Sequence, residues 1–314
     1  MRLIIGSRGS KLALWQAHWV RDQLAAAGFE IEMRIIKTTG DKLQTVAPGD
    51  PLPASVAQTV AATGSKGLFI KEIEEALLAR EIDVAVHSLK DLPTEQPAGL
   101  VLGAVPERED ARDVFISRNK NPFQDLPPGA RVATSSLRRQ TQLRALRPDL
   151  AYVAMRGNLD TRLRKLERGD CEALVLAAAG VRRLGLGERI TSYFRPDQMC
   201  PAVGQGALGI EIRADDGCAR QAVTPFDHLA THQAVRAERG VLRHLGGGCQ
   251  VPIAAHAEVE AGHLQLQGLV ANLDGTRLIR AQTEGPASEG EALGVAVAED
   301  LLRQGAREIL DMIK

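Results

Sequence analysis

The sequence predicts two α/β domains around a cleft, followed by a smaller α+β domain with a small antiparallel sheet. Short β-rich runs alternate with helical patterns in the first third of the chain, which is typical of an α/β domain with a largely parallel sheet. The same alternation starts again after the charged run 107–110. The C-terminal part differs, because three strand-like runs lie between two helical patterns, as in an α+β domain. The length of 314 residues suits this organisation.

In the first domain, Ser10 is expected to cap a helix that runs to Ala27 and ends at Gly28. A second helix is expected at 69–80. Residues 43–63, rich in Pro, Ala and Gln, are expected to form a mobile loop. Strands are expected at 2–7, 31–38, 82–86 and 100–105. The strand-like run 207–213 is expected to return to this domain, which would comprise residues 1–105 and 207–224.

The second domain, residues 106–206, is expected to contain helices at 136–147 and 159–168 and strands at 113–117, 131–134, 152–155 and 173–176. The third domain, residues 225–314, is expected to begin with a long helix at 227–245. Strands at 251–259, 263–272 and 276–283 follow, and one helix at 289–313 closes the chain.

The charges balance overall but are segregated along the chain. There are 39 Lys and Arg and 39 Asp and Glu, which argues against a polybasic nucleic-acid-binding protein. Between Pro106 and Cys200, however, 16 Arg and 2 Lys stand against 12 acidic residues, a net charge of +6. Arginine forms bidentate hydrogen bonds to carboxylate and phosphate groups, so the arginine excess in this region favours a polyanionic small-molecule ligand. Solvated helix faces are the alternative interpretation.

The N-terminal sequence has no signal-peptide pattern, and no apolar run is long enough for a membrane helix. The four cysteines show no CxxC pair and no zinc spacing. A cytoplasmic protein with free thiols is therefore expected. His228 and His232 lie four apart on an expected helix, but no third ligand is evident. We expect a surface or packed pair there, and no metal site.

Several anion-binding patterns occur where an expected strand meets a helix. Gly6–Lys11 and Thr134–Arg139 place hydroxyl groups, backbone N–H groups and arginines at helix N-termini. Capping explains the hydroxyl groups, but not the pair Arg138 and Arg139, whose charges oppose the helix dipole. A bound carboxylate would compensate them. Further arginines follow other strands, and the carboxyl ends of parallel strands form the ligand crevice of open α/β sheets. These are Arg156, Arg162, Arg182 and Arg183.

Three other motifs each have more than one interpretation. Gly204–Gly209 matches the dinucleotide pattern GxGxxG, but an alternating strand follows it instead of a helix, so a turn or hinge is expected. His87–Asp91 places ionisable groups after a buried strand. Asp91 could stabilise a developing cation or cap a turn. Cys249 lies on a glycine-rich loop, where an inert buried thiol is the more common outcome.

Taken together, the motifs resemble those of the hydroxymethylbilane synthase family, also called the porphobilinogen deaminases. The matching runs occur in family order over nearly the whole chain: Leu12–His18, Lys66–Phe69, Ala85–Asp91, Thr134–Arg139, Leu184–Leu186, Pro201–Gly206 and Gly247–Pro252. One departure is Ala62, which stands where many members have a lysine.

This resemblance implies a transferase of porphyrin, haem and tetrapyrrole biosynthesis. It would condense four porphobilinogens head to tail with loss of ammonia, and water would then release linear hydroxymethylbilane. The implied cofactor is one dipyrromethane per chain, held by a thioether at Cys249, with Asp91 as the catalytic residue. The resemblance also implies a periplasmic-binding-protein-like arrangement of the first two domains.

The remaining site residues are implied in the same way. The implied cofactor-binding residues are Lys90, Ser88, Thr134, Ser135, Ser136, Arg138, Arg139 and Asp41. The implied substrate-binding residues are Arg8, Ser10, Gln16, Lys66, Phe69, Arg156, Arg162, Arg183 and Gln205. A monomer that binds neither nucleic acid nor membrane is expected. The alternative is a two-domain cytoplasmic anion-binding protein without catalysis.

Overall fold

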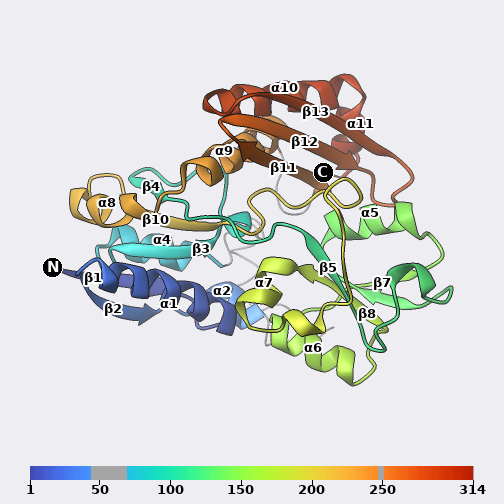
Figure 1. Cartoon of the computed structure of the whole chain (residues 1–314), viewed down its shortest axis with the longest axis horizontal. Coiled ribbons are helices and arrows are strands. Elements are labelled where there is room, and N and C mark those ends of the chain that lie inside the picture. The colour runs from blue at the N-terminus through green and yellow to red at the C-terminus, as the bar shows by residue number, and fades with distance from the viewer. Residues whose placement is uncertain (44–68, 247–250, 314) are drawn as a thin grey trace. The chain divides into compact units, whose positions relative to one another are not determined.

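The computed structural model describes residues 1–43, 69–246 and 251–313. The chain forms two compact units (Figure 1). Unit 1 comprises Met1–Arg108 and Ala207–His232, and unit 2 comprises Glu109–Gly206 and Gln233–Lys314. No helix among the described residues has the length and apolar character that a membrane crossing requires.

Unit 1 contains a five-stranded mixed sheet in the order β2-β1-β3-β10-β4. The strands are β1 (Arg2–Ser7), β2 (Glu30–Ile35), β3 (Val84–Ser88), β4 (Leu100–Ala104) and β10 (Leu208–Arg213). β1, β2 and β3 run parallel, whereas β10 is antiparallel to both β3 and β4. The expectation that 207–213 returns to this sheet is confirmed, and the strand lies inside it instead of at its edge.

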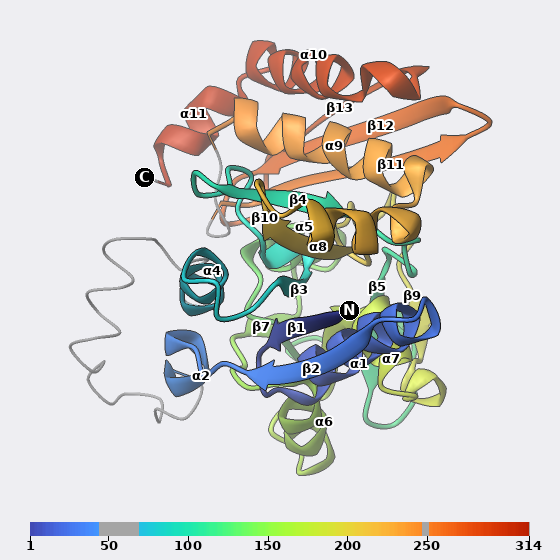
Figure 2. The ribbon, with the colours of Figure 1, turned by 90° about the vertical axis from the view of Figure 1, so that its left-hand side faces the viewer.

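Helices cover both faces of this sheet (Figure 2). α1 (Lys11–Ala26) and α8 (Gly217–Val223) bury apolar side chains such as Val20 and Val223 against one face. α4 (Lys71–Leu78) packs Ile73 and Leu77 against the other face. The short helix α2 (Thr39–Leu43) follows β2. Ser10 is the N-cap of α1, as predicted, and accepts a hydrogen bond from the Ala13 N–H.

Unit 2 contains a sheet of the same design in the order β7-β6-β8-β5-β9. Its strands are β5 (Asp113–Ser117), β6 (Arg131–Ala133), β7 (Ala151–Val153), β8 (Ala173–Ala177) and β9 (Ser192–Tyr193). β5, the first strand after the chain enters unit 2, is antiparallel to β8 and takes the place that β10 has in unit 1. Helix α5 (Leu137–Leu146) covers one face, and α6 (Leu159–Glu167) with α7 (Ala178–Arg183) covers the other.

A second sheet in unit 2 is antiparallel and consists of β11 (Ile253–Glu260), β12 (His263–Ala271) and β13 (Leu278–Pro286). α9 (Leu229–His244), α10 (Gly290–Arg303) and α11 (Ala306–Asp311) accompany this sheet (Figures 1 and 2). They supply apolar side chains to the core on one face of it. The predicted α+β arrangement is therefore confirmed.

Each α/β sheet is largely parallel, as predicted, and includes one antiparallel strand, which is β10 in unit 1 and β5 in unit 2. One expectation is wrong in detail. The single closing helix is divided into α10 and α11 by Gly305, whose φ of +96° lies in the left-handed region that favours glycine. The predicted loop at 43–63 lies almost entirely outside the described residues.

Candidate active site

The turn that carries Asp91 follows directly from β3. The 3₁₀ helix η1 (Leu89–Asp91) is fixed on both sides by buried leucines, Leu89 and Leu92. The Leu89 N–H also donates a 3.0 Å hydrogen bond to the Ala207 carbonyl. The carboxylate of Asp91 is partly exposed, and no hydrogen bond or ion pair engages it within the described residues. The backbone is thus held firmly while this carboxylate stays available to a ligand.

Two predicted site residues support the end of β3. The Gln16 amide, buried on α1, donates a 2.8 Å hydrogen bond to the Ser88 hydroxyl group. Ser88 lies immediately before η1, and Lys90 lies within it. The structure therefore brings Gln16 and Ser88 together beside the turn of Asp91.

A second group in unit 1 joins Arg8, Asp41 and Phe69. The Arg8 guanidinium donates to the Asp41 carboxylate, with Nη2 2.5 Å from Oδ1. The same guanidinium lies 4.2 Å from the centre of the Phe69 ring. Partial burial acts to raise the pKa of Asp41, but Arg8 and the hydrogen bonds from Thr38 outweigh it and hold this pKa below its ordinary value. Asp41 is therefore a stable anion that orients Arg8.

In unit 2, the hydroxyl groups of the turn before α5 have local structural roles. Ser136 caps the helix and accepts from the Arg139 N–H. Thr134, which is buried, accepts from the Ser136 N–H. Ser135 bonds to the backbone of Met155 in both directions, and its side chain is exposed. The turn is thus pre-formed, with Ser135 at its surface.

The arginine pair after this turn is compensated from within the protein. Arg138 Nη1 lies 2.7 Å from Asp113 Oδ2, and Arg139 Nε lies 2.9 Å from Asp113 Oδ1. The predicted substrate residue Gln205 also donates to Asp113, at 3.0 Å. Burial works to raise the pKa of Asp113, but Arg138 and Arg139 bring it far below its usual range. The carboxylate that sequence reasoning assigned to a ligand is supplied by Asp113.

Two of the three other predicted arginines donate hydrogen bonds to backbone carbonyl groups. Arg162 Nε donates to the Gly157 carbonyl at 2.8 Å, and Arg183 Nη2 to the Gly206 carbonyl at 2.7 Å. Burial, with the charge of Arg139 as a second cause, lowers the pKa of Arg162 to about 10. Burial also lowers the pKa of Arg183 to about 10, against the opposing effect of Glu109. Arg156 is exposed just after β7.

Two predicted residues, Lys66 and Cys249, lie outside the described residues. The structure does describe the residues of two other predictions. Residues 203–206 form a turn that leads into strand β10, so the predicted turn is confirmed. His228 and His232 bond to different partners, Thr231 and Asp227.

Sequence reasoning missed several buried polar residues. Asp113 has no exposed side-chain surface, and Glu238 accepts from the Gly204 and Ala257 N–H groups. His87 and Glu211 form a buried pair in unit 1. The available signal was a charged residue within or beside an apolar strand, as at Asp113 and Glu211, because burial of a charge requires a partner.

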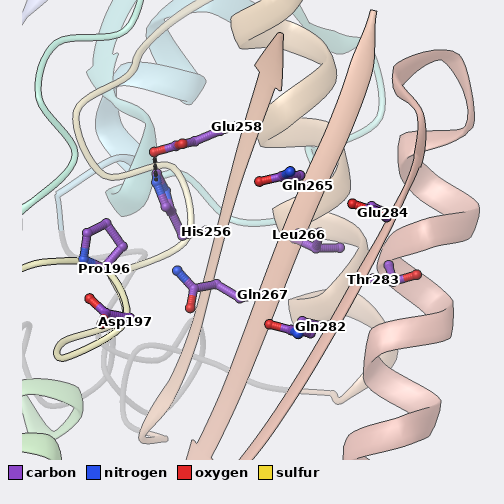
Figure 3. Close-up of a pocket in the computed structure, with 10 residues that line it drawn as sticks. All are labelled: Pro196, Asp197, His256, Glu258, Gln265, Leu266, Gln267, Gln282, Thr283 and Glu284. Atoms are coloured by element: carbon purple, nitrogen blue, oxygen red, sulfur yellow. Dashed lines mark hydrogen bonds and ion pairs between the residues drawn. The ribbon is translucent and has the colours of Figure 1, made fainter.

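A pocket of about 670 Å³ in unit 2 contains none of the predicted site residues (Figure 3). It lies over the β11–β13 sheet, with Pro196 and Asp197 at its edge, and polar side chains such as His256 and Gln267 point into it. The candidate site therefore rests on the strand-end residues described above, not on this pocket.

Comparison with known proteins identifies the family. Residues 3–221 match the family model described as porphobilinogen deaminase, dipyromethane cofactor binding domain. Residues 232–303 match the model for the porphobilinogen deaminase C-terminal domain. The chain belongs to the porphobilinogen deaminase family. Members of this family are transferases, and the first model describes a dipyrromethane-binding domain, so family membership supports that cofactor.

Curated porphobilinogen deaminases are similar over almost their full length. The Geobacter sulfurreducens protein is 51% identical, and the match covers 98% of this chain and 94% of the relative. The Desulforudis audaxviator protein is 53% identical, with 99% and 98% covered. Among solved structures, a YaeC-family lipoprotein from Enterococcus faecalis has a TM-score of 0.42 at 14% identity, covering 71% of this chain and 90% of that chain. The family expected from the sequence motifs is confirmed.

Proposed function

We propose that the chain works as a hydroxymethylbilane synthase, joining four porphobilinogen molecules head to tail and releasing the linear product by hydrolysis. Its relatives carry the porphobilinogen deaminase name, and the predicted transferase activity agrees with them. The observation that carries the proposal is Arg162. This partly buried guanidinium bonds to a carbonyl and makes no ion pair within the described residues. Each substrate ring carries two carboxylates, which would supply the missing partner.

Asp91 is the proposed catalytic residue. Loss of ammonia from porphobilinogen leaves a cationic methylenepyrrolenine, which a nearby carboxylate stabilises. Asp91 has such a carboxylate on a rigid turn, with no other partner within the described residues. It can also accept hydrogen bonds from pyrrole N–H groups.

The donor groups of this chain fit a dipyrromethane, whose rings carry carboxylates. Ser135 is an exposed residue of a pre-formed turn, and the Nε of buried Arg138 has no hydrogen-bond partner within the described residues. We propose a thioether to Cys249, one group per chain, held by Ser88, Lys90, Thr134, Ser135, Ser136, Arg138, Arg139 and Asp41. When bound, the group supplies the free pyrrole carbon to which the first substrate is joined.

Different groups of the protein hold the proposed substrate-binding arginines in place before a substrate binds. Arg162 and Arg183 are held by carbonyl groups, and Arg8 is oriented by Asp41 and Phe69. Such preorganisation lowers the entropic cost of binding a carboxylate. The full proposed set is Arg8, Ser10, Gln16, Lys66, Phe69, Arg156, Arg162, Arg183 and Gln205. A cytoplasmic monomer remains the proposed state, which size-exclusion chromatography with light scattering tests.

Intact mass and turnover test the proposal together. The freshly purified protein is expected to exceed its sequence mass by one dipyrromethane, to give a red colour with Ehrlich's reagent and to consume porphobilinogen. Cys249→Ser is expected to lose the added mass, whereas the matched control Cys218→Ser, on α8, is expected to retain it. Covalent cofactor in Cys249→Ser would place the attachment elsewhere.

Asp91→Asn is expected to keep the cofactor but to lose turnover by about 10²-fold or more, because the amide cannot stabilise the cation. Asp215→Asn, an exposed carboxylate of unit 1, is the matched control. Undiminished turnover in Asp91→Asn would refute the assigned role. Tight anion binding by the wild-type protein without porphobilinogen consumption would instead favour the non-catalytic alternative.

A further inference from the structure

Three ionisable side chains of unit 1 meet beneath helix α4, next to the strand that carries the catalytic turn. His87 on β3 and Glu211 on β10 are 4% and 0% exposed, and His87 Nε2 lies 3.1 Å from Glu211 Oε2. Glu74 on α4 completes the group, because its pKa responds to the charges of both. None of the three has a role in the proposed function.

The strand register explains why these residues share one face. β3 and β10 are antiparallel, with Glu211 opposite Ala85 and Gly209 opposite His87. Opposite residues point to the same side of a sheet, and Ala85 packs against Ile73 and Leu77 of α4. His87 and Glu211 therefore lie on the face that α4 covers.

The hydrogen bonds of this cluster are incomplete within the described residues. Glu211 Oε1 and Glu74 Oε1 are both buried without a hydrogen-bond partner there. Buried carboxylate oxygens are normally satisfied, so an extra proton on one carboxyl group accounts for part of the deficit. Burial first, and the charge of Glu211 second, raise the pKa of Glu74 to about 7, while His87 acts in the opposite direction. Glu74 is thus the member that takes the proton.

Other charged groups on the packed elements have partners of their own. On α4, Glu75 pairs with Lys71, and Glu72 accepts from Thr39. On β10, Arg213 is engaged by Asp83 and Asp216. On β1, Arg2 pairs with Glu32, and β4 has no ionisable residue.

We propose that Glu211 is a positioning residue of the catalytic turn. Its carboxylate bonds to the His87 imidazole and thereby fixes the end of β3. Ser88 follows His87 directly and pairs with Leu208 of β10, and Leu89 then bonds to Ala207. Glu211 and the catalytic turn are thus joined through the same pair of strands.

The inference rests on the proposed role of Asp91, so its test uses the cofactor-loaded enzyme. Glu211→Gln is expected to lower kcat about tenfold while KM stays within about twofold, because misplacing a catalytic group impairs the reaction more than it impairs binding. Glu211→Leu is expected to be worse, so the glutamine variant is a partial rescue. Glu75→Gln, on the exposed side of α4, is the activity control.

A spectroscopic readout separates positioning from general stability. In ¹⁵N-histidine NMR, the His87 signal, assigned by its absence from His87→Asn, is expected to shift in Glu211→Gln and not in Glu75→Gln. Thermal unfolding tests whether Glu74 carries this proton in the native state. The raised pKa of Glu74 means that the native state loses stability as pH rises from about 4.5 through about 7. Glu74→Gln is expected to lack this loss and to melt at a higher temperature than wild type at pH about 8.

Wild-type kcat in both Glu211 variants, or an unchanged His87 signal, would overturn the positioning role. An unchanged pH dependence of melting in Glu74→Gln would overturn the proton assignment. Absence of turnover in the wild-type holoenzyme would instead contradict the proposed function.

Discussion

Asp113 has no exposed surface, and its two carboxylate oxygens accept from Arg138, Arg139 and Gln205. The sequence shows that an arginine pair at a helix start needs an anion. It does not show which one, because Asp113 lies 25 residues before Arg138 and reaches it only through the packing of β5 against α5. Local sequence patterns therefore identified the arginine pair, whereas the identity of its anionic partner could be found only from the tertiary structure.

Asp113→Asn is expected to destabilise unit 2 by about 3–5 kcal/mol, because it leaves two buried guanidinium groups without their anion. The shift of the urea unfolding midpoint measures this. Asp149→Asn, which breaks an exposed pair with Arg147, is expected to have little effect. Equal stability of the two variants would show that the buried pair needs no anion.

Acid should have the same effect as this substitution. Burial opposes ionisation of Asp113, but the arginines keep its pKa well below the ordinary 3.8. The stability that this carboxylate contributes is therefore present above about pH 4 and is lost as pH falls. A smaller acid-induced loss in Asp113→Asn than in wild type, measured by urea unfolding at stepwise lower pH, is the expected result.

Arg162→Gln is expected to raise the KM for porphobilinogen by about 10- to 100-fold, because it removes one charge-assisted hydrogen bond to a carboxylate. Steady-state kinetics measure this. Arg168→Gln is the control, since Arg168 is exposed and pairs with Asp170. A KM as low as that of wild type would remove Arg162 from the proposed substrate site.

At the scale of elements, periodicity and capping residues predicted most helices and strands to within a few residues. The errors have physical causes. The spacing of apolar residues does not show in which direction a strand runs, so the sequence did not predict that β5 and β10 are antiparallel. Nor did the apolar pattern near the C-terminus reveal the break at Gly305, because helical spacing continues in α11.

The contact between α9 and α10 depends on two glycines. A Cβ atom on Gly294 would lie 2.4 Å from the Ala237 carbonyl oxygen and 3.1 Å from the Gly240 Cα atom. Gly294→Ala is therefore expected to force the helices apart and destabilise the fold by about 1–3 kcal/mol, although alanine favours helix. Thermal unfolding measures the change. Gly217→Ala, in α8 with open space around it, is expected to be neutral or stabilising.

At the scale of the whole molecule, the net charge of +6 between Pro106 and Cys200 is distributed unevenly. Arg131, Arg147 and Arg195 are matched by nearby acidic residues. The excess remains on residues such as Arg156 and Arg162, which make no ion pair within the described residues. Composition thus predicted an anion-binding region, and the ion pairs narrow it to a few side chains.

Such an excess should attract the carboxylates of the substrate. The kcat/KM for porphobilinogen is expected to fall as NaCl rises from about 0.01 M to about 0.5 M, because salt screens long-range attraction, whereas kcat is expected to change less. Sucrose at matched osmolality controls for solvent effects. A kcat/KM that does not depend on salt would contradict electrostatic attraction.

The position of β10 has a consequence for biosynthesis. This strand lies between β3 and β4, yet it is translated about a hundred residues after them. Until the ribosome releases residue 213, the nascent N-terminal segment has two strand edges without their neighbour, and such edges invite aggregation. Unit 2, although later in the sequence, has all the strands of its first sheet by residue 193. The β7-β6-β8-β5-β9 sheet of unit 2 can therefore form on the ribosome before the sheet of unit 1 is complete.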